Sequence, residues 1–183
     1  MKVGDVMTKD VLVCYAQDRL DCPARIMWEN DVGCVPVLDT DNRLSGIVTD
    51  RDICMAAYTQ GLPIAAIPVT VAMAHAVATC KAGDELAAAE RTMQQQQIRR
   101  LPVVDESGRL TGILSLNDLA RAAAGERSKP TRVVGTDEVL VTLARIGQPR
   151  LKTGVGMPPA PPQPAAESRV PSAKANKGRA AST

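Results

Sequence analysis

Two short segments carry the same residue types at the same spacing, and these types could bind a phosphate and a sugar. The segments contain Gly46, Thr49 and Asp52 in one case and Gly112, Ser115 and Asp118 in the other. A hydroxyl residue followed three positions later by an acid is typical of a helix start, where free N–H groups and the helix dipole attract a phosphate. The carboxylate offers two acceptor oxygens to a ribose diol. The glycine, which lacks a Cβ, lets the backbone or a ligand approach closely.

The same residues also fit a purely structural role. A hydroxyl residue and an acid three positions apart form a capping box, in which each side chain bonds the other residue's backbone N–H. An acid in the first turn of a helix is also favourable for the helix dipole alone. Because the pattern occurs twice with its glycine intact, we favour ligand binding. A duplicated structural cap is the alternative interpretation.

Both segments belong to a longer internal repeat. Pro36 and Pro102 are 66 residues apart (102 − 36), and the same offset aligns Asp52 with Asp118. Without a gap, it also aligns Val3 with Val69, Met7 with Met73, Cys14 with Cys80, Leu20 with Leu86 and Met27 with Met93. An ungapped register of this length indicates two copies of one structural unit.

Each copy is predicted to fold as β-α-β-β-α, from runs of apolar residues, helical apolar spacing and turn residues. The elements expected in the first copy are a strand at 11–14, a helix around 20–28, strands at 35–38 and 44–49, and a helix at 50–60 ended by Gly61. Those expected in the second are a strand at 77–80, a helix around 86–93, strands at 101–104 and 110–115, and a helix at 116–124. Pro23 must lie in the first turn of its helix, where proline is tolerated.

One such unit would leave an apolar sheet face uncovered, whereas two units packed back to back can bury it. We therefore expect an α/β (α+β) fold in which two repeats pack with pseudo-symmetry. The expected divisions are 1–66 for the first repeat, 67–125 for the second, 126–148 for a connector and 149–183 for a tail.

The connector is predicted to contain a short amphipathic helix that Thr136 caps and Gly147 ends. Its expected apolar side consists of Val139, Leu140, Leu143 and Ile146. The tail from residue 149 is rich in Pro, Ser, Ala, Lys and Arg. Such a composition cannot bury enough apolar surface to offset chain entropy, so we expect the tail to be disordered.

Composition excludes several classes of protein. The chain has 183 residues and a net charge of +2, with one Trp, two Tyr and no Phe, so it lacks an array of rings for stacking on single-stranded nucleic acid. Residues 1–125 carry 12 basic and 16 acidic side chains, and residues 126–183 carry 10 and 4, so the positive charge lies in the tail. Five cysteines without a CxxC pair argue against a disulfide framework and a structural zinc site. We find no catalytic constellation, signal peptide or membrane span, and expect a cytoplasmic protein that is not an enzyme.

The sequence resembles a tandem pair of CBS domains, also called a Bateman module. The resemblance is carried by VGDVMTKDVLV, VPVLDTDNRLSGIVTDRDI and LPVVDESGRLTGILSLNDL, and it covers residues 1 to about 124. It implies a cleft between the repeats that binds an adenosyl ligand such as AMP, ADP, ATP, S-adenosylmethionine or NAD. The ligand would be regulatory, and no catalytic cofactor is implied.

The resemblance also implies roles for particular residues. Asp52 and Asp118 would bind ribose, and Thr49 and Ser115 would lie near the first phosphate, each pair at its own site with Gly46 or Gly112 nearby. Backbone and aliphatic groups across the cleft would hold the adenine; the matching positions are Thr8, Val11 and Val32, and in the second copy Val77 and Ile98. Arg99 and Arg100 match basic residues that reach phosphates in the family. The first copy has Gly33 and Cys34 at those positions, so its site is electrostatically different.

We therefore predict a regulatory adenine-nucleotide sensor that acts on a partner in trans. The resemblance further implies a homodimer, with contact through helix faces that one module leaves exposed. The alternative is a dimeric scaffold whose basic tail binds nucleic acid or an anionic surface, since nucleic acid could be bound only through that tail. Strong salt dependence that is lost on deletion of residues 149–183 would favour this alternative.

Overall fold

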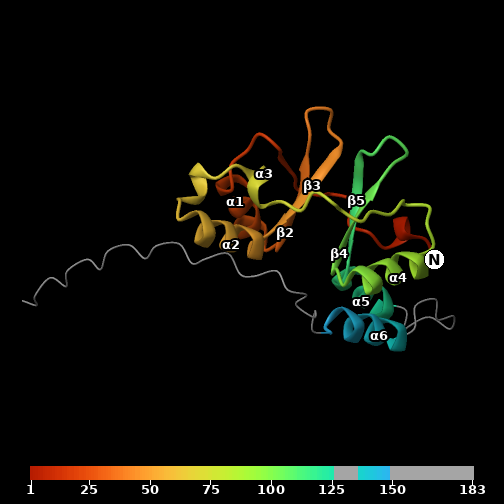
Figure 1. Cartoon of the computed structure of the whole chain (residues 1–183). Coiled ribbons are helices and arrows are strands. Elements are labelled where there is room, and N and C mark those ends of the chain that lie inside the picture. The colour runs from red at the N-terminus through yellow and green to blue at the C-terminus, as the bar shows by residue number, and fades with distance from the viewer. Residues whose placement is uncertain (126–135, 149–183) are drawn as a thin grey trace, which may run out of the picture.

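The computed structural model describes residues 1–125 and 136–148. They form two α/β halves that lie side by side (Figure 1), and the predicted α/β class is confirmed. The predicted disordered tail at 149–183 lies outside the described residues. Within the described residues, no helix is both long enough and apolar enough to cross a membrane.

The first half closely follows the predicted order of elements. It contains β1 (Cys14–Tyr15), α1 (Asp21–Asn30), β2 (Cys34–Leu38), β3 (Leu44–Thr49) and α2 (Asp50–Gln60). β1 pairs parallel to β2, and β2 pairs antiparallel to β3. Pro23 lies in the first turn of α1 as expected, and Gly61 ends α2 in the left-handed conformation, with φ of 61°. The strand expected at 11–14 begins only at Cys14, because only Cys14 and Tyr15 reach β2.

The second half repeats this arrangement. It contains α4 (Leu86–Gln96), β4 (Arg100–Val104), β5 (Leu110–Ser115) and α5 (Leu116–Gly125), with β4 antiparallel to β5. The strand expected at 77–80 is reduced to a single parallel bridge between Cys80 and Val103. Cys14 and Cys80 are both buried core residues, as their equivalent positions indicate. Burial raises the pKa of the Cys14 thiol to about 12 and that of Cys80 to about 11.

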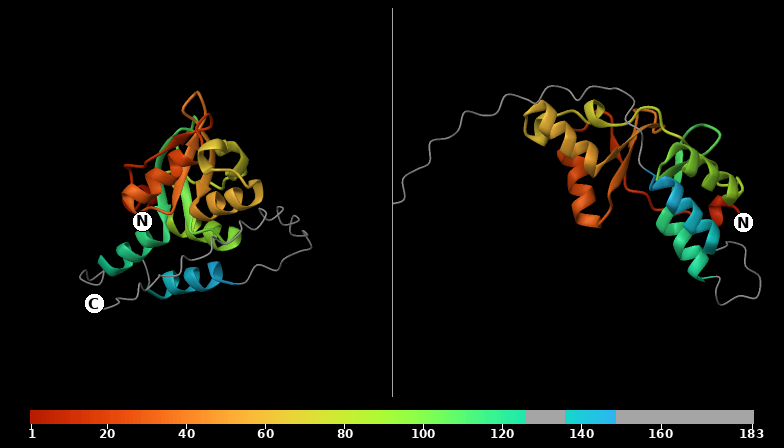
Figure 2. Two further views of the ribbon diagram at one scale, coloured as in Figure 1. Left: turned by 90° about the vertical axis from the view of Figure 1, so that its left-hand side faces the viewer. Right: turned by 60° about the horizontal axis from the view of Figure 1, so that its bottom comes forward.

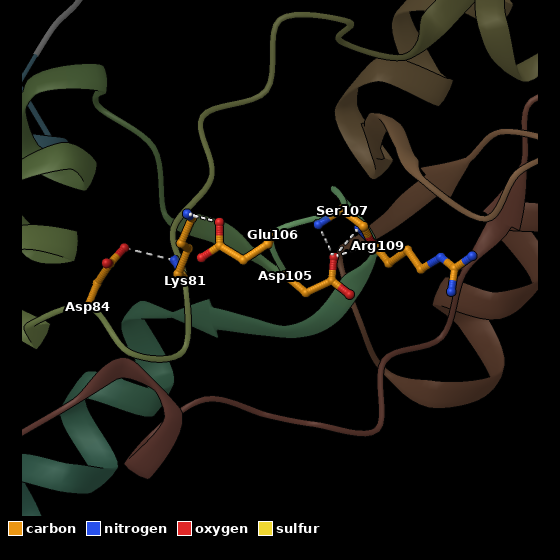
Figure 3. Close-up of polar contacts among 6 residues, drawn as sticks. All are labelled: Lys81, Asp84, Asp105, Glu106, Ser107 and Arg109. Atoms are coloured by element: carbon orange, nitrogen blue, oxygen red, sulfur yellow. Dashed lines mark hydrogen bonds and ion pairs between the residues drawn. The ribbon is translucent and has the colours of Figure 1, made fainter.

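An aspartate organises the turn between the two antiparallel strands of each half. In the turn between β4 and β5, Asp105 Oδ1 accepts hydrogen bonds from the backbone N–H groups of Ser107 and Arg109, at 2.8 and 2.9 Å (Figure 3). The Ser107 hydroxyl also donates to it, and these bonds lower the pKa of Asp105. Asp39 holds the backbone of Asp41 and Arg43 in the same way. In both turns, an aspartate carboxylate therefore holds the backbone N–H groups of the next few residues, as is typical of Asp in turns.

Each half is completed by a segment from the other repeat. The first residues, including η1 (Val3–Asp5), pack on the second half, so the N-terminus lies beside α4 (Figure 1). In return, α3 (Val69–Ala72) of the second repeat packs on the first half, beside η2 (Ile64–Ala66) at the end of the first repeat. Val3 and Val69 are equivalent in sequence and both fully buried, each in the core of the opposite half. The repeats of the sequence are therefore not the packing units of the fold.

The two segments that contain η1 and α3 are called the crossing segments, because each packs on the half formed by the other repeat. Backbone bridges fix them in place. Thr8 and Ile113 exchange two N–H···O bonds, at 3.0 and 2.9 Å, and Ala74 and Ile47 exchange two more, at 2.9 and 3.1 Å. Gly112 precedes Ile113, and a Cβ there would lie 2.6 Å from Met7 Sδ and 2.9 Å from the Thr8 carbonyl oxygen. Glycine is therefore required because a crossing backbone passes directly over the strand.

The connector helix α6 (Thr136–Ile146) packs on α4 and α5 and not on the first half (Figures 1 and 2). Val139 and Ile146 contact the core of the second half, and Gln94 of α4 donates a 2.8 Å hydrogen bond to the buried Thr142 hydroxyl. The expected apolar side is only partly correct, because Leu140 and Leu143 remain 59% and 53% exposed. The side of α6 that faces α4 carries the hydrogen-bonded Thr142, whereas Leu140 and Leu143 were expected on the packed side.

Candidate functional site

A cavity of about 630 Å³ lies where the two halves meet. Its lining comes from five parts of the chain: the segment after η1, the start of β2, the start of β4, the junction of β5 with α5, and α6. Seven residues expected at a binding site line it together: Thr8, Val11, Val32, Arg99, Arg100, Ser115 and Asp118. A volume in this range is typical of small-molecule sites.

The start of α5 is fixed by a capping box at the floor of the cavity. The Ser115 backbone N–H and hydroxyl both donate to Asp118 Oδ2, the former at 2.7 Å. The Asp118 backbone N–H donates to the Ser115 hydroxyl at 3.2 Å. The structural interpretation of the repeated pattern is therefore correct at this junction, but it uses only one oxygen of the carboxylate.

The second oxygen of Asp118 is available to groups in the cavity. Thr8 donates its hydroxyl to Oδ1 at 3.1 Å, and Arg121, one turn along α5, forms an ion pair with the same atom. The Asp118 side chain is 2% exposed and that of Arg121 is 70% exposed. A buried carboxylate needs such donors, and both residues that donate to Oδ1 are themselves exposed.

Arginine and cysteine side chains line the wall beside Ser115, because Arg100 is the partner of Ser115 in the pairing of β4 with β5. Arg99 and Arg100 border the cavity from the start of β4, and Arg100 reaches across to Gly33, where a Cβ would lie 3.1 Å from its Nη2. Cys34 lies beside them, and its pKa is raised by burial despite the nearby Arg100 guanidinium. This wall can bind an anion through the arginines, and Cys34 stays protonated at neutral pH.

The other expected site residues lie elsewhere. Thr49 and Asp52 form their own capping box at the start of α2, with the Thr49 backbone N–H donating to Asp52 Oδ2 at 2.9 Å, and they do not line the cavity. Gly46 admits the crossing segment in its half, since a Cβ there would lie 2.9 Å from the Ala74 carbonyl oxygen. Gly112, Val77 and Ile98 also lie outside the cavity lining.

Several residues of the lining were not expected from the sequence. Arg121 and Leu143 are the most informative, because the first pairs with Asp118 and the second comes from α6. Arg121 follows Asp118 by three positions on a predicted helix, and that spacing is a usable signal for an ion pair. The position of Leu143 has no comparable signal, because it depends on how α6 packs.

Among the described residues, no group of three or more His, Cys, Asp or Glu side chains is placed to hold a metal ion. The polar groups that line the cavity include Thr8, Arg99 and Asp118, which can form hydrogen bonds and ion pairs.

Residues 3–58 and 65–125 match the family model described as CBS domain, so the match includes both repeats. The CBS domain-containing protein YhcV of Bacillus subtilis is 36% identical over 118 residues, which are 64% of this chain and 82% of that protein. A homoserine O-acetyltransferase of Methanohalophilus mahii is 33% identical over 70% of this chain but only 26% of its own length. The similarity to that enzyme therefore concerns one part of it.

Solved structures share the same architecture. Hypoxic Response Protein I, crystallised with two coordinated zinc ions, has a TM-score of 0.60 and 30% identity over 66% of this chain and 98% of its own. CBSX2 in complex with AMP has a TM-score of 0.59 and 27% identity over 69% of this chain and 98% of its own. The similarity covers both halves, as the coverage of those chains indicates.

Proposed function

Because the chain belongs to the CBS domain family, we propose that it is a regulatory module whose cavity binds an adenine nucleotide, with AMP as the first candidate. Support for the adenosyl class comes from the similarity to CBSX2, which is known in complex with AMP. The ligand is regulatory, and the module changes the behaviour of a partner in trans. S-adenosylmethionine and NAD belong to the same ligand class and are tested beside the nucleotides.

The observation that carries the proposal is the set of groups around Asp118. The capping box leaves Oδ1 facing the exposed Arg121, so a ribose hydroxyl can replace that guanidinium as a donor. The positive end of the α5 dipole and the Ser115 hydroxyl suit the first phosphate, and Arg99 and Arg100 suit its charge. Val11 and Val32 supply apolar contacts for the base.

A non-catalytic role suits the same cavity. Its lining has no histidine, and its one thiol, Cys34, has a pKa raised by burial. A nucleophile needs a neighbouring base or a lowered pKa, so the groups present favour binding over covalent chemistry. The match to part of a homoserine O-acetyltransferase is consistent with a regulatory segment beside a separate catalytic one.

The ligand signal is proposed to leave the module through α6. Leu143 of α6 lines the cavity near Arg121 of α5, while Val139 and Ile146 anchor the helix on the second half. A ligand that contacts Leu143 or moves Arg121 changes the contacts of α6, and that difference in contacts between the free and bound states is what allows regulation.

Thermal unfolding with AMP, ADP, ATP, S-adenosylmethionine and NAD tests the binding. A ligand at 100 times its dissociation constant is expected to stabilise the native state by about 2.7 kcal/mol. Hydrogen exchange with the stabilising ligand then reports on the output, and slower exchange at residues 136–146 is expected. A constant melting temperature with all five ligands would refute nucleotide binding, and stabilisation without any change in α6 would refute only the output route.

Association into a homodimer is proposed through α1 and α2, which pack against each other. They expose Trp28, Met55 and Tyr58, at 89%, 45% and 52%, while α6 covers the equivalent helices of the second half. A patch rich in aromatic residues can meet its own copy across a twofold axis. Light scattering over a dilution series should give twice the chain mass, and Trp28→Ser should lower it. A wild-type monomer at every concentration would disprove the dimer.

A further inference from the structure

The two repeat junctions have the same local structure. At the start of α2 and at the start of α5, an aspartate accepts a bond from the N–H of the hydroxyl residue three positions before it, at 2.9 Å for Asp52 and 2.7 Å for Asp118. The return bonds to the hydroxyl oxygens are 3.3 and 3.2 Å. A role as helix cap is thus common to both junctions, and a difference in function must come from other atoms.

The junctions differ at the second carboxylate oxygen. Asp118 Oδ1 accepts from Thr8 and Arg121. The 66-residue offset places Ala74 and Met55 at the equivalent positions, and neither side chain can donate a hydrogen bond. Among the described residues, the recorded side-chain hydrogen bonds of Asp52 are all with Thr49. Of the two aspartates, Asp118 is therefore the one with hydrogen-bond donors at both carboxylate oxygens among the described residues.

The electrostatic surroundings differ as well. Asp50 begins α2, so that helix has Asp50 and Asp52 in its first turn, whereas α5 begins with the apolar Leu116, which lines the cavity. The Asp50 carboxylate lies near Gly33 on the side that Arg100 also approaches, at 3.3 Å from a Cβ built there. An anion at the start of α2 would have Asp50 in the same helical turn, whereas the equivalent position of α5 is the apolar Leu116. The cavity at the start of α5 is lined by Asp10 and Asp31 as well, but there Arg99 and Arg100 accompany them.

We infer that the module binds one ligand per chain, at the junction of β5 with α5, and that the equivalent junction of β3 with α2 is a structural helix cap. The inference rests on the proposed adenine-nucleotide function, which it makes more specific. Thr8 acts as a positioning residue, since it orients Asp118 Oδ1 from the crossing segment. The duplicated sequence pattern thus serves binding in one copy and helix capping in the other.

Calorimetric titration of the full chain with AMP tests this with a matched pair of variants. Asp118→Asn and Asp52→Asn make the same change in the same capping box, and asparagine still offers an oxygen to the helix start. The wild type is expected to bind one AMP per chain. Asp118→Asn should weaken binding by at least about tenfold, because a charge-assisted bond is lost, and Asp52→Asn should leave the affinity within about twofold of the wild-type value.

Thr8→Ala, which introduces the residue found at position 74, is a second variant that leaves the helix cap intact. It should weaken AMP binding about threefold to tenfold, as expected for the loss of one neutral hydrogen bond. Two AMP per chain, or equal losses in the two aspartate variants, would overturn the single-site inference while leaving the nucleotide function in place. No binding of AMP, ADP or ATP to the wild type would overturn both.

Discussion

Replacing Arg99 and Arg100 together by glutamine is expected to weaken AMP binding by about 100-fold or more, while adenosine binding stays nearly unchanged. Both arginines line the cavity, and two charge-assisted hydrogen bonds to a phosphate contribute about 1.5–3 kcal/mol each. Adenosine lacks the phosphate and therefore does not use them. Calorimetric titration with the two ligands, on wild type and double variant, measures the difference directly.

The matched control is Arg91→Gln, which removes an exposed arginine of α4 that is not part of this cavity. It should leave both affinities unchanged, so that a general effect of net charge can be separated from a local one. If the double variant lost AMP and adenosine affinity equally, the arginines would be shaping the cavity and not binding a phosphate. Arg99 is exposed and Arg100 half-buried, so the fold should tolerate both changes.

The second large effect is expected on stability, from Gly112→Ala. The new Cβ would lie 2.6 Å from Met7 Sδ and 2.9 Å from the Thr8 carbonyl oxygen. The sulfur can move, but the carbonyl is held by the Ile113 N–H at 2.9 Å, so the crossing segment must shift or lose its bridge. Overpacking of this kind costs about 1–3 kcal/mol, and thermal unfolding should show a melting temperature lower by several degrees.

Gly83→Ala provides the control, because a Cβ at Gly83 would meet no atom within 4 Å. Its melting temperature should stay close to that of the wild type. Equal melting temperatures for Gly112→Ala and the wild type would mean that the crossing segment is not tightly bound to β5. In that case Thr8 could not orient Asp118 as the single-site inference requires.

Local structure was predictable wherever it depends on neighbouring residues. The bounds of β3, β5 and α2 agree with the sequence pattern, because alternating apolar residues, an N-terminal hydroxyl residue and Gly61 act within a few positions. The capping boxes at both junctions were predictable for the same reason. The bounds of the first strand in each repeat were less predictable, because a strand needs a partner strand. In the first repeat only two residues, Cys14 and Tyr15, pair with β2.

The candidate site was predictable only in its residue types. The pattern around Ser115 and Asp118 was recognisable from spacing, whereas Arg99 and Arg100 were implied by the resemblance to the CBS family. All four residues line one cavity. Spacing did not distinguish that junction from the one at Thr49 and Asp52, which has the same residue types at the same spacing. The difference comes from Thr8 and Arg121, which reach Asp118 from a remote segment and from the next helical turn.

The sequence by itself therefore determined the two-fold repeat, most element bounds and the chemistry of each junction. The tertiary structure alone decided that residues 1–8 complete the second half and that Thr8 meets Asp118. Val3 and Val69 are interchangeable in an apolar pattern, so the pattern cannot say which core each one enters. That choice depends on packing and backbone pairing between segments distant in sequence, which are properties of the folded chain as a whole.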